Sequence, residues 1–455
     1  MKELGYPPGP ESVWRAYLQL FRDPLEFAAR MAREYGDLVH LQSGSRHDYL
    51  INHPDLIKSV LLAGEEEMWR SFPRPMKRVM GQGLLTSQGE FHRRQRNLIR
   101  PSFHHQHMPV FGSVITRHSL RLAEEWKDHQ QVDIFAAMLR LSMGVVSEAL
   151  FGGDISGVAD EITGLMQALV EMTRKTPLPF LGELAAKLRL PRARRYEKAR
   201  ARMNAIIYRM IEERRREPGE GSDLLSSLLR LQHPQDGSPG ISDEQVRDEA
   251  ITIFMAGHET VASALAWTWY LLSQHPESEE RLHRELQSVL GGRTPTAADL
   301  PGLTYTGMVL SESMRLYPPV WLMVRRPVKD YALDGYIAPA NSYLHVSQYV
   351  MHRDARYFPN PERFDPDRWT AAGVAARPKF CYFPFGAGSR KCIGEGLAWL
   401  EGILVLATLA QHWSPRLAPG HRVEPHPLVT LRPKYGILMT LHCRADKPHI
   451  QTATA

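Results

Sequence analysis

The amino-acid sequence predicts a mainly α-helical protein with a smaller β-rich lobe. Up to about residue 290, apolar residues recur with a helical period between readable caps and breaks. Beyond Pro318, prolines become frequent and the apolar runs shorten, which is typical of short strands and irregular loops. Because the composition shows no internal repeat and no change that would mark a boundary, we expect residues 1–455 to form a single domain.

Several elements can be predicted from their caps and periodicity. The stretch DPLEFAARMAREYG predicts a helix that starts after an aspartate and ends at Gly36, and LVHLQSGSRHDYLINHP alternates around a turn as a β-hairpin does. The stretches KTPLPFLGE and HPQDGSPG predict breaks between helices. A strong helix is expected from Glu395 to about His412, and the polar tail after His442 is expected to be disordered.

Residues 243–276 form an unusual segment because they are apolar nearly all round. Such a helix is either buried in a large protein or spans a membrane. His258, Glu259 and Thr260 lie in its middle, where a charge would be costly in lipid, so a central buried helix is favoured. Glu259 could serve there simply as the partner of a buried cation.

Charge and cysteine content limit the class of protein. The net charge is +6, but basic and acidic residues alternate along residues 192–217, which favours a solvated helix over a nucleic-acid patch. Three cysteines are too few for a disulfide framework. The opening residues hold no apolar run of signal-peptide or membrane-anchor length. We therefore expect a cytoplasmic protein without a transmembrane anchor, with at most peripheral membrane contact.

The loop PFGAGSRKCIG places Cys392 among small residues just before a predicted helix. A lone cysteine is usually a small buried hydrophobe, as we expect for Cys381 and Cys443. Here the positive end of the helix would favour a thiolate, which is a metal ligand, and glycines would let backbone N–H groups approach the sulfur. Arg390 could then reach a carboxylate of a flat cofactor lying over Cys392.

Phe385, Gly388, Arg390, Cys392 and Gly394 form the pattern F-x-x-G-x-R-x-C-x-G, which resembles the haem-binding loop of the cytochrome P450 family. The resemblance implies the cytochrome P450 fold. It also implies that Cys392 is the axial thiolate to the iron of haem b, iron protoporphyrin IX.

Two further motifs follow the order that the family would require. AGHET resembles the family's oxygen-activating turn, in which Ala256 and Gly257 lie against the haem and Glu259 and Thr260 form an acid–alcohol pair. ESMR resembles the family's E-x-x-R motif, so Glu312 and Arg315 would share one helix face and pair. The family completes this network with a second arginine. Both NPERF and FDPDRW contain P-x-R; the preceding F-x-P favours Arg368 over Arg363, which would be a surface residue.

Haem propionates are carboxylates and need cationic or hydrogen-bonding partners. GEFHRRQRNLIRPSF resembles the family helix that usually carries W-x-x-x-R, which maps to His92 and Arg96 with histidine in place of tryptophan. Arg325 matches the family's remaining propionate arginine, whereas Arg326 does not. Any one of these arginines alone could be an ordinary surface charge.

The resemblance runs from PPGP to TLRPKYGILM, and the motifs look most like soluble bacterial carotenoid and fatty-acid hydroxylases. It implies a haem-thiolate monooxygenase that inserts one oxygen atom from O2 into a C–H bond of a hydrophobic small molecule. Electrons would come from NAD(P)H through a separate ferredoxin or flavodoxin with its reductase. Thr260 would hold the bound oxygen and Glu259 would relay protons. Exposed basic residues near Cys392 could steer an acidic partner or be merely solvated: Arg93, Arg94, Arg100 and Lys391.

Other functions fit the same motifs. A peroxide-driven peroxygenase, or a relative that rearranges peroxides, would typically have replaced the acid–alcohol pair, which is intact here. A non-catalytic haem-thiolate sensor would be expected to carry an effector domain, and none is visible. Carotenoid, fatty acid, terpenoid and steroid substrates all remain open. The resemblance places the following apolar residues in the substrate pocket: Leu84, Leu85, Phe254, Ala256, Val320, Trp321, Leu322, Met323, Ile437 and Leu438.

Overall fold

The computed structural model describes residues 5–152, 161–169 except 163 and 167, 191–216, 223–232 and 240–444. The predicted break at KTPLPFLGE, nearly all of the one at HPQDGSPG, and the tail beyond residue 444 lie outside the described residues.

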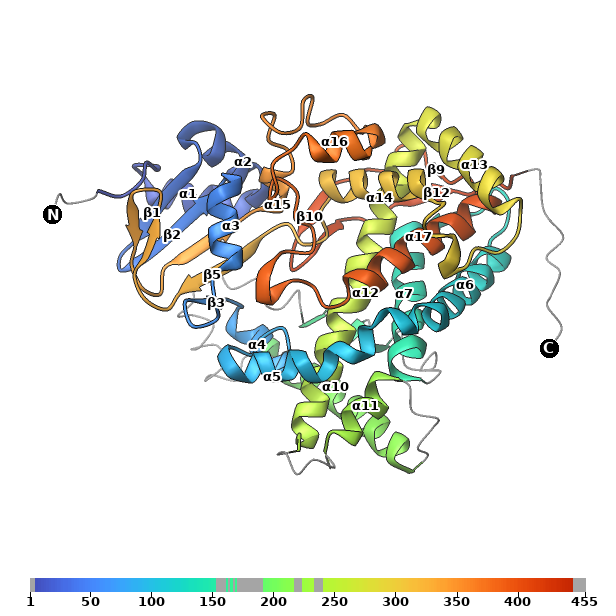
Figure 1. Ribbon diagram of the computed structural model, residues 1–455, viewed down its shortest axis with the longest axis horizontal. Helices are drawn as coiled ribbons and strands as arrows, with labels where there is room; N and C mark the ends of the chain where they lie inside the picture. The colour runs from blue at the N-terminus through green and yellow to red at the C-terminus, as the bar shows by residue number, and fades with distance from the viewer. Residues whose placement is uncertain are drawn as a thin grey trace.

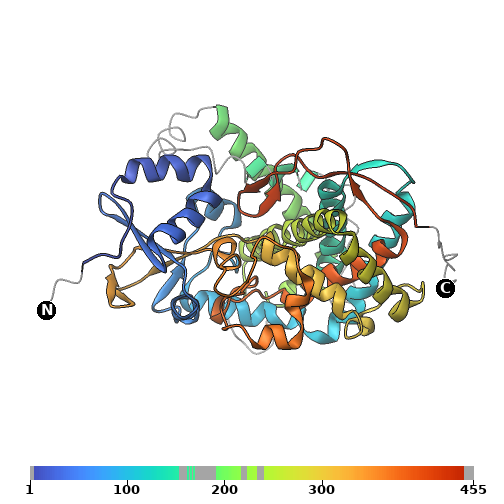
Figure 2. The same cartoon turned by 90° about the horizontal axis from the view of Figure 1, so that it is seen from above.

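The helical body is built around one long helix (Figures 1 and 2). This helix, α12 (Asp243–Gln274), packs against α7 (Ile134–Phe151), α14 (Thr304–Leu316) and α17 (Glu395–His412). The other α-helices are α1 (Val13–Arg22), α2 (Pro24–Tyr35), α3 (Pro54–Leu62), α4 (Arg74–Met80), α5 (Gly89–Ile99), α6 (Met108–Glu125), α10 (Pro191–Arg216), α11 (Leu224–Arg230), α13 (Pro276–Leu290), α15 (Gln348–Met351) and α16 (Ala371–Ala375). Short 3-10 helices are η1 (Arg100–Phe103), η2 (His105–His107), η3 (Ala297–Asp299), η4 (Pro366–Trp369) and η5 (Gly388–Arg390).

The β-rich lobe lies at one end of the molecule, beside α1 and α2, and α6 and α13 lie at the other end (Figure 1). Its main sheet has the strand order β1-β2-β8-β5-β3. Those strands are β1 (Leu38–Ser43), β2 (Arg46–Ile51), β3 (Met68–Arg70), β5 (Met323–Pro327) and β8 (Tyr343–Val346). The smaller sheets pair β6 (Tyr331–Leu333) with β7 (Tyr336–Ala338), β10 (Pro425–Pro427) with β11 (Leu431–Pro433), and β12 (Leu438–Thr440) with both β4 (Gln131–Asp133) and β9 (Arg416–Leu417).

The elements predicted from caps have the expected bounds. Asp23 caps α2 by accepting a hydrogen bond from the Glu26 N–H at 3.1 Å, and the helix ends at Gly36, whose φ of 87° suits glycine. The predicted hairpin is β1–β2, with Leu38 opposite Ile51. The predicted helix after Cys392 is α17, which begins at Glu395 and ends at His412. These local signals were sufficient because each one acts within a few residues of the helix end or turn that it sets.

Helix α12 is buried on nearly all faces, as its apolar sequence predicts. Among the residues that the structure describes, only α7 has the length and apolar composition of a membrane span, and most of α7 is buried inside the helical body. Phe151 of α7 stacks on Phe254 of α12 with ring centroids 4.1 Å apart. Helix α7 therefore packs as a core helix.

Candidate functional site

A cavity of about 570 Å³ lies between α12, the loop that holds Cys392, and the β-rich lobe. It brings together most of the residues that the sequence singles out. The predicted site residues that line it are Leu84, Leu85, His92, Arg96, Ala256, Gly257, Glu259, Thr260, Val320, Trp321, Leu322, Met323, Arg325, Phe385, Arg390 and Cys392. Residues from five separate stretches of the chain thus share one cavity.

Cys392 is exposed to this cavity. Its backbone N–H donates to the Phe385 carbonyl at 2.9 Å, which closes the loop tightly before α17. Burial raises the pKa of the Cys392 thiol above its usual range, and a hydrogen bond from the Gly394 backbone opposes that rise. The loop therefore holds sulfur beside an N–H group near a helix start, but the thiolate needs a further positive charge for its stabilisation.

Two glycines of this loop are required by its backbone. Gly386 and Gly388 both have a φ of 68°, in the left-handed region. A Cβ on Gly388 would also lie 2.4 Å from the Leu61 carbonyl oxygen, so α3 packs directly on the loop. Gly394 has a φ of −91° and room for a Cβ, so its contribution is the N–H group and not conformational freedom.

The acid–alcohol pair lies in the middle of α12 with its two members in different surroundings. The Thr260 hydroxyl donates to the Ala256 carbonyl at 2.8 Å at the cavity wall. Glu259 is buried and accepts a hydrogen bond from the Thr430 hydroxyl at 2.5 Å, with Arg432 Nη1 4.0 Å away. Glu259 is therefore held by the β10–β11 hairpin, and its carboxylate has a nearby cation.

Gly257 lies where α12 approaches α7 closely. A Cβ there would lie 2.9 Å from Val146 Cγ2, so glycine permits the close packing of α12 on α7. Gly257 and Val146 both line the cavity, so this close approach lies at the cavity wall.

The end of the cavity beside the β-rich lobe carries a cluster of cations. Arg96 comes from α5, Arg325 from β5 and Arg390 from η5, and all three line the cavity. Arg70, which sequence reasoning missed, lies opposite Arg325 in the β3–β5 ladder and lines the cavity too. Burial lowers the pKa of Arg325 to about 10, and repulsion from Arg390 adds to this effect.

One carboxylate, Glu65, contacts this cluster, and no sequence motif points to it. Glu65 Oε2 lies 2.9 Å from Arg390 Nη2, and Glu65 Oε1 is in contact with His92 Nδ1. Arg390 Nη1 also donates to the Ser87 carbonyl at 2.8 Å. Burial, followed by the nearby arginines, lowers the pKa of His92 to about 3, so its ring is neutral. Four arginines therefore face the cavity with a single carboxylate among the described residues in contact with them.

The Glu312 network is outside the cavity and fully buried. Arg315 Nε and Nη2 each donate to the Glu312 carboxylate at 2.8 Å. Arg368 Nε lies 3.3 Å from Glu312 Oε1, and Trp369 Nε1 donates to Oε2 at 2.9 Å. Arg363 contributes only its backbone carbonyl, to Arg315, and its side chain is exposed. The structure thus places Arg368, and not Arg363, beside the buried pair.

Three predicted pocket residues lie elsewhere. Phe254 is turned toward α7, two residues and about 200° around the helix from Ala256. Ile437 is tied to the start of α7, where its carbonyl accepts the Ile134 N–H at 2.9 Å, and Leu438 pairs with Asp133 in β12–β4. Neither residue lines the cavity.

The turn of the β10–β11 hairpin takes the place predicted for Ile437 and Leu438. Residues 427–430 line the cavity, and the Trp321 Nε1–H donates to the Leu428 carbonyl at 2.9 Å. The Trp267 Nε1–H of α12 donates to the Leu431 carbonyl at the same distance, so the hairpin is anchored from two sides. The sequence feature that could have pointed to this hairpin is a turn between two proline-containing strands.

Comparison with known proteins agrees with this site. The sequence model of the family described as Cytochrome P450 matches residues 7–440. Cyclooctatin synthase and cyclooctat-9-en-7-ol 5-monooxygenase of Streptomyces melanosporofaciens are 39% and 37% identical, and both alignments cover 91% of this chain and 90% of the relative. Pentalenene oxygenase of Streptomyces avermitilis is 31% identical over 94% of both chains.

Among solved structures, the retinoic acid-bound cyanobacterial CYP120A1 superposes with a TM-score of 0.86 at 25% identity, covering 97% of this chain and 100% of that one. The predicted mainly α fold with a smaller β-rich lobe is thereby confirmed as the cytochrome P450 fold. The family match over nearly the whole chain, and relatives named as oxygenases, make the protein an oxidoreductase. The chain belongs to the cytochrome P450 family.

Proposed function

We propose that this protein is a haem-thiolate monooxygenase that hydroxylates an apolar terpenoid. Its family implies haem iron as cofactor and O2 as oxidant. The finer assignments are our proposal: haem b, Cys392 as its axial ligand, and electrons from NAD(P)H through a separate ferredoxin or flavodoxin with its reductase. One observation carries it, namely that Cys392 shares one cavity with Thr260 and with four arginines.

The charges around the cavity fit a cofactor with two propionates. Buried charges need partners, yet the four arginines have Glu65 alone as a contacting carboxylate within the described chain. Arg325 Nη2 is buried without a hydrogen-bond partner, and Arg325 itself is 3% exposed. Two additional carboxylates would neutralise this excess, and a flat apolar ring would extend from them toward Cys392. Arg70, Arg96 and Arg325 are the residues we assign to the propionates.

Arg390 has a second role in this proposal. Its guanidinium is already engaged by Glu65, Ser87 and Gln88, which ties the loop of Cys392 to the segment before α5. The Arg390 Nε atom remains without a hydrogen-bond partner. We infer that Arg390 positions the loop and raises the positive potential on the propionate side.

The chain itself would supply positioning and protons. Bound haem would supply the activation of O2, from which the inserted oxygen atom comes. The Thr260 hydroxyl, at the cavity wall, would turn its single hydrogen from the Ala256 carbonyl toward O2 and accept a hydrogen bond in turn. Glu259 would bring protons from the hairpin side, where Thr430 and Arg432 now hold its carboxylate.

The remaining cavity wall supports an apolar substrate. Leu84, Leu85 and the segment Val320–Met323 present hydrocarbon to the space above Cys392. Two relatives carry the names of unsaturated apolar compounds, cyclooctat-9-en-7-ol and pentalenene. These names favour terpenoids over the other substrate classes that the sequence leaves open, while retinoic acid in CYP120A1 favours an elongated isoprenoid.

The test combines a ligand variant with substrate binding. Cys392→Ser should abolish the thiolate spectrum of the carbon-monoxide-bound ferrous protein, whereas Cys443→Ser, outside the cavity, should leave it intact. Retention of that spectrum in Cys392→Ser would refute the ligand assignment. Titration of the ferric protein with terpenoids, fatty acids, carotenoids and steroids should give a saturable low-spin to high-spin shift with terpenoids.

Turnover then separates the alternatives. Product formation that requires O2, NAD(P)H and a redox partner supports the monooxygenase. Equal turnover with hydrogen peroxide alone would favour the peroxygenase, and binding without turnover under either condition would favour the sensor.

A further inference from the structure

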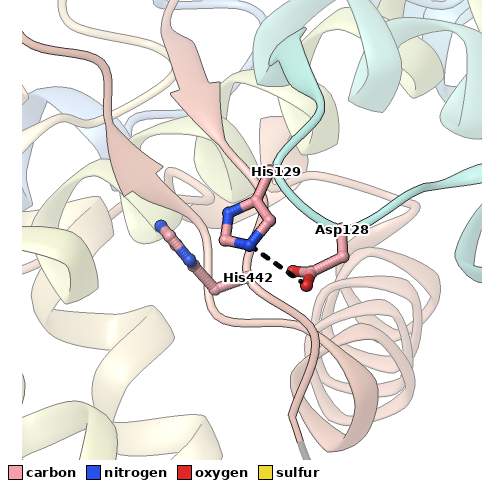
Figure 3. Close-up of side chains that lie close together, drawn as sticks. All are labelled: Asp128, His129 and His442. Carbon is pink, nitrogen blue, oxygen red and sulfur yellow. Dashed lines mark ion pairs between the residues drawn. The ribbon is translucent and has the colours of Figure 1, made fainter.

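A cluster of metal-ligand side chains lies on the surface, away from the cavity. Asp128 and His129 belong to the turn before β4, and His442 follows β12 (Figure 3). Gln131 pairs with Thr440 in the β4–β12 ladder, so extending that register by two residues places His129 opposite His442. The fold thus brings together side chains that are more than three hundred positions apart in the sequence.

The geometry of the cluster suits a small cation. One ligand atom from each residue lies within 4.8 Å of the others. His129 Nε2 and Asp128 Oδ2 are 3.4 Å apart, and two ligands of a tetrahedral zinc ion with bonds of 2.0–2.1 Å are separated by about 3.3–3.4 Å. The two histidine rings meet edge to face with centroids 5.4 Å apart.

The carboxylate is fixed in place by the backbone. Asp128 Oδ1 accepts the Cys443 N–H at 2.8 Å, which leaves Oδ2 for the cation. His129 has a φ of 61°, which is uncommon for a residue other than glycine, and the His129 N–H donates to the Leu441 carbonyl at 2.8 Å. Two of the three ligands are therefore held by the same pair of chain segments.

We propose that Asp128, His129 and His442 bind a divalent transition-metal ion, with zinc as the best fit. Two imidazoles and one carboxylate are ligands of the kind that zinc takes, and a hard ion such as Mg²⁺ prefers oxygen ligands. The fourth position would be taken by water. None of the three residues lines the cavity, so the ion would not take part in oxygen chemistry.

The bound ion would join the turn before β4 to the last described strand. That junction also holds the start of α7, because Asp133 Oδ1 accepts N–H groups from both Phe135 and Ile437. Zinc would therefore stabilise the attachment of the chain's C-terminal strand to the helical body, since an ion that binds only the folded state stabilises it.

The experiment uses untagged holoenzyme, freed of divalent metal ions other than the haem iron by a chelator and titrated with Zn²⁺ in a calorimeter. Wild-type protein should bind one zinc ion at this site. In His129→Ala and His442→Ala, the dissociation constant for zinc should be at least about tenfold higher, which is a loss of about 1.4 kcal/mol or more in binding free energy. His105→Ala, which removes an exposed histidine outside the cluster, should bind as wild type does. Equal binding by the wild type and both cluster variants would overturn the proposal.

Two further measurements separate a ligand role from a structural one. Asp128→Asn retains an oxygen that can accept the Cys443 N–H but loses the charge, so it should keep the metal-free melting temperature and lose zinc-dependent stabilisation. Zinc X-ray absorption should show nitrogen and oxygen ligands at about 2.0–2.1 Å. A spectrum dominated by zinc–sulfur scattering would place the ion elsewhere and overturn the assignment.

Discussion

The buried carboxyl group of Glu249 on α12 should make the stability of the protein depend on pH. Its side chain is fully buried, and its Oε2 atom accepts the Leu84 N–H at 2.8 Å. The neighbouring Asp248 accepts the Gln82 N–H at 2.6 Å. Since Leu84 lines the cavity, these two carboxyl groups position the loop that forms part of its wall. Burial raises the pKa of Glu249 from 4.5 to about 8.

This pKa makes stability depend on pH with a definite sign. Between pH 4.5 and about 8, Glu249 is protonated in the folded state and ionised in the unfolded state. The folded state therefore binds the extra proton, so the free energy of unfolding falls as pH rises, by about 1.4 kcal/mol per pH unit. Glu401, whose pKa burial also raises to about 8, contributes a second slope of the same sign.

Glu249→Gln keeps an oxygen for the Leu84 N–H and removes the ionisation. The free energy of unfolding of the variant, relative to that of wild type, should rise by about 3 kcal/mol as the pH is raised from 5.5 to 7.5. The measurement is urea unfolding of the holoprotein, followed by circular dichroism at pH 5.5, 6.5 and 7.5. Glu244→Gln, at a side chain that is 74% exposed, is the control and should follow wild type. Parallel curves for wild type and Glu249→Gln would refute the reasoning.

Two other substitutions test the loop and the hairpin. Gly388→Ala should lower the free energy of unfolding by about 1–3 kcal/mol and reduce haem retention in gel filtration, because the φ of Gly388 is 68° and an added Cβ would meet a carbonyl oxygen. The control is Gly396→Ala, which should be tolerated because the nearest contact of its Cβ would be at 3.7 Å. Equal losses in the two variants would contradict this account. Thr430→Val should leave the carbon-monoxide spectrum unchanged. It should lower the ratio of product formed to NAD(P)H consumed, on the order of tenfold, because the Glu259 carboxylate loses its hydroxyl partner. An unchanged ratio would argue against a role of Glu259 in proton delivery.

The parts of the fold that the sequence predicted are those governed by local signals. Helix α2 is set by a cap and a glycine, and the hairpin at residues 38–51 by alternation around a turn. The spacing of Glu312 and Arg315 puts both on one face of a helix, so their pairing needed no tertiary information. Local periodicity could also have excluded Phe254, because Ala256, Glu259 and Thr260 share a face of α12 that it does not.

The parts that the sequence did not predict depend on pairing between distant segments. Arg70 reaches the cavity only because β3 pairs with β5, and Glu65 contacts Arg390 across a separation of 325 positions in the sequence. Neither residue carries a motif. Ile437 and the hairpin turn at residues 427–430 are close in sequence. Only the turn lies at the cavity wall, where hydrogen bonds from Trp267 and Trp321 hold the hairpin.

The charges of the cavity connect cofactor binding to the assembly of the fold. Arg70 and Arg325 come from the β-rich lobe, whereas Cys392 precedes α17 of the helical body. Burial, followed by repulsion from neighbouring arginines, lowers the pKa of both Arg70 and Arg325, so this end of the cavity concentrates positive charge. A dianionic cofactor ligated at Cys392 would relieve that repulsion and bridge the two regions. On the proposed assignment, the arginines that bind the cofactor would also make the folded state depend on it, because without the cofactor their charges would be buried without those carboxylate partners.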